Sequence, residues 1–74
     1  SALQRAFLHA GSPSVVSTLW LVDDRAAARL LDLFYRQVER KKSLSDSLRA
    51  AQLHLIREGV PPYVWAAFVL TGRH

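Results

Sequence analysis

One run of apolar and β-branched residues, SVVSTLWLVDD from Ser14 to Asp24, constrains the fold more than any other stretch of this sequence. The residues in it that favour a pleated backbone are Val15, Val16, Thr18, Leu19 and Val22. Because the run is almost continuously apolar, it predicts a central strand that is covered on both faces. Its last residues, Asp23 and Asp24, would then lie at the carboxyl end of the strand, where open α/β sheets bind ligands.

Length and composition indicate one small domain with a thin core. The chain has 74 residues, of which 50% are hydrophobic, and a domain of this size buries only about 60% of its unfolded-chain surface. We therefore expect part of its apolar surface to contact another segment. Cysteine is absent, which excludes a disulfide, a zinc–thiolate site and a cysteine nucleophile within these residues. The sequence shows neither a membrane-spanning run nor a signal peptide, so we expect a cytoplasmic chain that does not contact a membrane.

The net charge of +4 does not by itself predict a nucleic-acid partner. The basic residues are not interleaved with aromatic residues, which nucleic-acid-binding surfaces use for base stacking. His9 and His54 lie on predicted helices without a neighbouring cysteine or acid at metal-ligand spacing, and His74 is terminal, so we predict no metal site. No glycine-rich phosphate loop is present, so no cofactor is expected.

A short helix is predicted over residues 2–10, before the apolar run. Its apolar residues repeat at helical spacing, and Gly11 can adopt the left-handed conformation that ends a helix. Pro13 then favours an extended backbone, so that a tight turn leads directly into the strand.

Two amphipathic helices are predicted after the two acids. The first extends from Asp24 to Lys41, with Asp23 as its N-cap and Asp24 in the first turn, where the helix dipole favours negative charge. Its apolar stripe consists of Ala27, Leu30, Leu31, Phe34 and Val38. We interpret the basic residues at its end as a solvated helix terminus, namely Arg40, Lys41 and Lys42.

The second of these helices is expected from Ser43 to about Glu58. Asp46, three residues after Ser43, completes a capping box, and Gly59 ends the helix. The residues at helical spacing are Leu44, Leu48, Ala51, Gln52 and Leu55. A short link would make the two helices an antiparallel hairpin.

A second strand is predicted over Val64–Thr71, after Pro61 and Pro62. The order helix-strand-helix-helix-strand makes the two strands antiparallel, because a helical hairpin returns the chain to the end of the sheet from which it left. Two strands have exposed edges, so this α/β fragment needs partner strands to complete its sheet.

At this point the sequence resembles a known family. The runs LQRAFLHAGSPSVVSTLWLVDDRAAARLLDLFYRQV, SLRAAQLHLI and PPYVWAAFVLTG resemble the carboxyl-terminal part of CHAT domains, which are caspase-like modules often found beside tetratricopeptide repeats. The segment LWLVDD also resembles its counterpart in separases. The resemblance covers nearly the whole chain without large gaps.

The resemblance implies that residues 1–74 are the small-subunit-like part of a caspase-like three-layer sandwich. The histidine and cysteine of the protease family would lie upstream, so these residues contribute no catalytic group. The expected partners are the remainder of the domain, a peptide substrate, and tetratricopeptide repeats or a second copy of the chain.

The resemblance also implies a substrate site. Separase-like proteases use an acid in this position to receive a basic substrate side chain, and the matching residue is Asp24, with Asp23 beside it. Trp20 could wall the same pocket, whereas we interpret Tyr63 and Trp65 as core or interface residues. The alternatives are that the acids act only as cap and dipole partners and that Trp20 only packs.

Two functions follow from this interpretation. The first is the substrate-recognition part of a cysteine endopeptidase, in which the chain is inactive alone because it has no thiolate. The second is a catalytically dead scaffold that self-associates through its exposed sheet edge.

Overall fold

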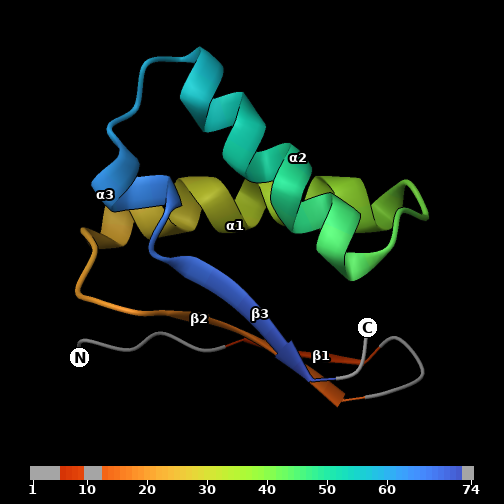
Figure 1. Cartoon of the computed structure of the whole chain (residues 1–74). Coiled ribbons are helices and arrows are strands. Elements are labelled where there is room, and N and C mark those ends of the chain that lie inside the picture. Colours follow the sequence, from red (N-terminus) through yellow and green to blue (C-terminus); the bar gives the residue numbers. More distant parts are fainter. Residues whose placement is uncertain (1–5, 10–12, 73–74) are drawn as a thin grey trace.

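The computed structural model describes residues 6–9 and 13–72 of the chain and shows the mixed α/β architecture that the sequence predicts. The elements in order are β1 (Ala6–His9), β2 (Pro13–Thr18), α1 (Asp24–Glu39), α2 (Leu44–Arg57), α3 (Pro62–Trp65) and β3 (Phe68–Gly72). Figure 1 shows all three helices on one side of the sheet. The described residues therefore form two layers, the sheet and the helices, of a partial α/β fold.

The sheet has three strands, with β2 in the centre as predicted. β1 and β3 both pair antiparallel with β2, and the register places Val16 opposite Leu70 and Thr18 opposite Phe68. The predicted antiparallel orientation of the last strand is confirmed. Within the described residues, β1 and β3 each keep one unpaired edge.

Only one face of β2 is covered by the described residues, which corrects the prediction of a strand covered on both faces. Ser14, Val16 and Thr18 are buried, whereas Val15 and Ser17 are half-buried. Because successive side chains of a strand point to opposite faces, the buried set faces the helices. The opposite face, which we call the open face, consists of Val15 and Ser17 of β2 and of Val69 and Thr71, which pair with them from β3.

The core lies between the sheet and the helical hairpin, which has the predicted antiparallel arrangement (Figure 1). The stripe predicted on α1 is confirmed, with Phe34 and Leu30 completely buried and Leu31 and Val38 packed at its margin. The buried apolar residues of α2 are Leu44, Leu48, Ala51 and Leu55. The basic residues that follow α1 are exposed, in agreement with the predicted solvated helix end.

The ends of α2 follow the predicted chemistry. The Ser43 Oγ atom accepts a hydrogen bond from the Asp46 backbone N–H at 3.1 Å, which makes Ser43 the N-cap. Gly59 follows the helix with a φ angle of +82°, a conformation that costs other residues energy.

The helix predicted over residues 2–10 is wrong where the structure describes it. Ala6–His9 form β1 and pair with β2, with Ala6 opposite Val16 and His9 opposite Pro13. Helical spacing over a few residues is a weak preference, and pairing with a neighbouring strand overrides it. Residues 2–5 and 10 of the predicted helix, and Gly11, lie outside the described residues.

The first half of the strand predicted over Val64–Thr71 is also wrong. Pro62 starts the short helix α3, because its fixed φ angle and missing N–H are compatible with the first position of a helix. The Ala66 N–H then donates to the Pro62 carbonyl oxygen at 2.8 Å. The strand begins only at Phe68, so the second half of the prediction is confirmed.

Candidate functional site

The segment of residues 19–23 connects the carboxyl end of β2 to α1 and is fixed to residues far away in the sequence. The Leu19 N–H donates to the Ala67 carbonyl oxygen at 2.9 Å. The Trp20 Nε1–H donates to the Tyr63 carbonyl oxygen at 2.7 Å. Val22 is buried in the core. The segment is therefore held against α3 and the start of β3.

The two acids follow this segment at the start of α1. One oxygen of the Asp23 carboxylate accepts a hydrogen bond from the Ala26 N–H at 3.1 Å, and the Asp23 carbonyl accepts one from the Ala27 N–H at 2.9 Å. The prediction that Asp23 caps the helix is confirmed. Asp24 lies in the first turn of α1, as predicted, and both acids are exposed. The positive end of the helix dipole favours negative charge at both positions.

Large apolar side chains in this connection and on the adjoining α3 remain exposed to solvent. The exposed fractions are 65% for Leu19, 41% for Trp20, 66% for Leu21 and 62% for Tyr63. Of the two interpretations of Tyr63, core or interface, the core role is therefore wrong for the described residues, and its contact with Trp20 is made by the backbone. Four such side chains around one connection are typical of a surface that receives another molecule. We call these four residues with Asp23 and Asp24 the β2–α1 surface.

Trp65 differs from Tyr63. Its indole is half-buried, and its Nε1–H donates to the Val60 carbonyl oxygen at 3.1 Å. Trp65 also packs against the core, which agrees with its interpretation as a core residue.

The cap at the start of α1 provides a first test of the site. We expect Asp23→Ala in the intact domain to lower the free energy of unfolding by about 1 kcal/mol, because the Ala26 N–H loses its acceptor. Asp23→Asn keeps an acceptor oxygen and should lower the free energy of unfolding by only a few tenths of that amount. Urea unfolding of both variants measures the difference, and equal losses would show that the charge of Asp23 matters rather than its hydrogen bond.

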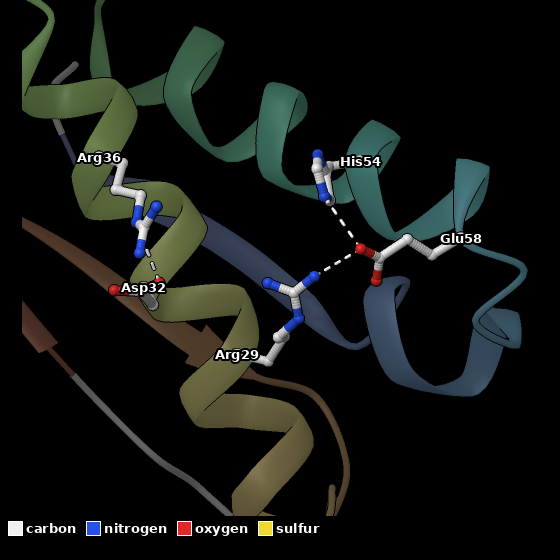
Figure 2. A network of polar contacts seen from close by, with 5 residues as sticks. All are labelled: Arg29, Asp32, Arg36, His54 and Glu58. Carbon is white, nitrogen blue, oxygen red and sulfur yellow. Dashed lines mark hydrogen bonds and ion pairs between the residues drawn. The ribbon is translucent and has the colours of Figure 1, made fainter.

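A second polar cluster connects α2 to α1 and was not predicted (Figure 2). One oxygen of Glu58 contacts the Arg29 Nη2 atom at 2.5 Å and the His54 Nε2 atom at 3.0 Å. Within α1, the Arg36 Nε atom lies 3.1 Å from an Asp32 oxygen. The interpretation of His54 as lacking an acidic neighbour is wrong, since Glu58 follows it by four residues on the same helix face.

The β2–α1 surface supplies carboxylate groups and aromatic rings. The chain has no cysteine, and no group of three or more potential metal ligands occurs within residues 6–9 and 13–72. Within the same ranges, none of the helices combines the length and apolar character needed to cross a membrane. The β2–α1 surface offers two carboxylates beside exposed aromatic rings, a combination that can receive a cation with an apolar stem.

Comparison with known proteins identifies the family. The family model described as CHAT domain matches residues 1–73. No match was found among curated proteins or among solved structures. Since the matched residues make up almost the whole sequence, this chain belongs to the CHAT domain family.

Proposed function

We propose that this chain is the substrate-recognition part of a caspase-like cysteine endopeptidase domain whose catalytic histidine and cysteine lie elsewhere in the domain. The β2–α1 surface is the observation that supports this proposal. It places two exposed carboxylates and exposed aromatic rings in and beside the connection that follows the central strand, and this connection is held in place by hydrogen bonds to Ala67 and Tyr63.

In this proposal the exposed Asp24 carboxylate receives the basic side chain of a peptide substrate. A carboxylate can accept two parallel hydrogen bonds from a guanidinium group, which selects arginine over lysine. The Trp20 indole is fixed by its bond to the Tyr63 carbonyl and leaves 41% of its surface exposed. It would cover the apolar stem of the arginine, while Asp23 orients the start of α1 through its cap.

The remainder of the domain would cover the open face and pair with the free strand edges. Val15 and Val69 on that face are only half-buried, and unpaired strand edges attract further strands. The three-stranded sheet would then be one part of a larger sheet that carries the nucleophile.

The test is cleavage by the intact parent domain. We expect Asp24→Asn to lower kcat/KM for peptides cleaved after arginine roughly 100-fold, which corresponds to about 2.7 kcal/mol of transition-state binding. The same variant should lose no more than about 1 kcal/mol of unfolding free energy, the contribution of a charge at a helix start.

Asp32→Asn is the matched control, because Asp32 is also on α1 but pairs with Arg36 away from the site. It should leave the cleavage rate unchanged. If Asp24→Asn lowers the free energy of unfolding as much as it lowers the free energy of transition-state binding, the role of Asp24 is confined to the start of α1.

A scaffold that self-associates is the second candidate, and the open face with its two free edges favours it. The two candidates differ in the upstream residues, since only the protease needs a histidine and a cysteine at strand ends. An intact domain that dimerises but cleaves no arginyl peptide would support the scaffold.

A further inference from the structure

A groove lies between α1 and α2, in addition to the β2–α1 surface. Its volume is about 320 Å³, at the small end of the range for ligand sites. Its apolar lining comes from Leu33 on α1 and from Ala50, Ala51 and Leu53 on α2; Ala51 is buried and the other three are half-buried. It has room for a few side chains of another molecule.

Three cations line this groove, and none of them forms an ion pair with a described residue. They are Arg40 and Lys42, which follow α1, and Arg57 at the end of α2. In contrast, Arg29 and Arg36 do have carboxylate partners, Glu58 and Asp32 (Figure 2). Glu58 lies one residue beyond Arg57 but already contacts Arg29 and His54. The groove therefore carries a positive charge that the described residues do not neutralise.

Gln37 adds a second, independent feature. It lines the groove, and its Oε1 atom is buried without a hydrogen-bond donor among the described residues. A buried acceptor without a donor costs free energy, because water can no longer solvate it. If the Gln37 side chain turns toward the groove, an occupant that brings an N–H group can donate to Oε1 and remove this cost.

From these features we propose that the groove between α1 and α2 binds a short acidic peptide segment of a partner protein. Its glutamate or aspartate side chains pair with Arg40, Lys42 and Arg57, its apolar side chains contact Leu33 and Leu53, and an N–H group donates to Gln37 Oε1. This inference does not depend on the proposed peptidase role.

A peptide fits these features better than a nucleic acid does. Among the described residues that line the groove, the His54 imidazole is the only ring, and it contacts Glu58, whereas single-stranded nucleic acids bind largely by stacking on several aromatic rings. A phosphate backbone carries no N–H donor for Gln37. The apolar lining also favours a ligand with aliphatic side chains.

The experiment measures binding of fluorescein-labelled ten-residue peptides to the intact parent protein. The peptides contain leucine, alanine and zero to four glutamates. We expect the affinity to rise with the number of glutamates up to three, the number of unpaired cations, and to fall with increasing salt. Arg57→Glu should weaken the binding of the tightest-binding peptide at least tenfold. Arg49→Glu, also on α2 but outside the groove lining, should weaken it less than twofold.

Gln37→Leu separates the proposal from simple charge attraction. The variant removes the buried acceptor, so we expect the unfolding temperature of the protein to rise by about 2 °C. Peptide binding should weaken at the same time, because the peptide N–H loses its acceptor. Charge attraction alone would leave the affinity of this variant unchanged, and that result would overturn the role of Gln37.

The docking proposal fails if no peptide of the panel binds below about 1 mM, or if Arg49→Glu weakens binding as much as Arg57→Glu does. It also fails if a single-stranded oligonucleotide of equal charge binds more tightly than the best peptide and depends on the same cations.

Discussion

Val16→Asp is expected to prevent the domain from folding. Val16 is 2% exposed and lies in the centre of the sheet, opposite Leu70 and beneath the helices. A carboxylate at this position would be buried without a partner, at a cost of several kcal/mol. This cost is comparable to the whole stability of a small domain, about 5 kcal/mol. Circular dichroism and urea unfolding of the intact domain measure the loss, and a wild-type midpoint would contradict the observed packing of β2.

Val15→Asp is the matched variant, because Val15 is the adjacent residue but belongs to the open face. If the remainder of the intact domain covers this face, as we propose, Val15→Asp should also cost more than about 2 kcal/mol. A loss below about 0.5 kcal/mol, typical of surface substitutions, would show that the open face remains in water in the intact domain. The pair of variants thus tests which faces of the sheet are covered.

Phe34→Ala is expected to lower the free energy of unfolding by about 3–5 kcal/mol. Phe34 is completely buried and lies in the middle of the α1 stripe. Truncation to alanine loses the burial of the ring and leaves a cavity, which neighbours such as Leu30 fill only partly. Urea unfolding of the intact domain measures this change through the midpoint, with the slope serving as a check that unfolding remains two-state.

Tyr35→Ala controls for the loss of an aromatic ring on α1. Tyr35 follows Phe34 and contacts it edge to face, with 5.4 Å between ring centroids, but is 40% exposed. We expect Tyr35→Ala to lower the free energy of unfolding by only about 1 kcal/mol, mostly because this ring contact is lost. Similar losses for both variants would mean that the core does not depend on the α1 stripe.

The helical hairpin could be predicted from the sequence because its information is local. Spacings of three and four residues define the stripe that contains Phe34, and the Ser43 hydroxyl and Gly59 define the ends of α2. Such signals act within one or two turns of a helix, so the sequence shows them directly. The predicted end of α1 at Lys41 lies only two residues beyond the observed end at Glu39.

The errors occur where distant partners decide the structure. Ala6–His9 become a strand because β2 supplies hydrogen bonds, and helical spacing over so few residues does not compete with them. The strand predicted from Val64 begins late because Pro62 takes the first position of a helix, where its fixed φ angle and missing N–H are compatible with the fold. The described residues cover one face of β2 and not both, because a continuously apolar run predicts burial without showing which partner provides it.

The candidate site was only partly predictable for the same reason. The cap formed by Asp23 follows from its position before α1. The bond from Trp20 to the Tyr63 carbonyl joins residues 43 positions apart, and no local pattern indicates it. His54 and Glu58 lie four residues apart, so that contact could have been predicted from the sequence.

The position of Trp20 makes the proposed recognition surface observable by its own fluorescence. The chain has two tryptophans. The Trp65 indole is half-buried against the core and hydrogen-bonded to the Val60 carbonyl, whereas the more exposed Trp20 belongs to the connection that leads to the two acids. Indole emission depends on contact with water, so a ligand that covers Trp20 changes the spectrum of that residue and protects it from a soluble quencher. Occupancy of this surface can therefore be followed without a label.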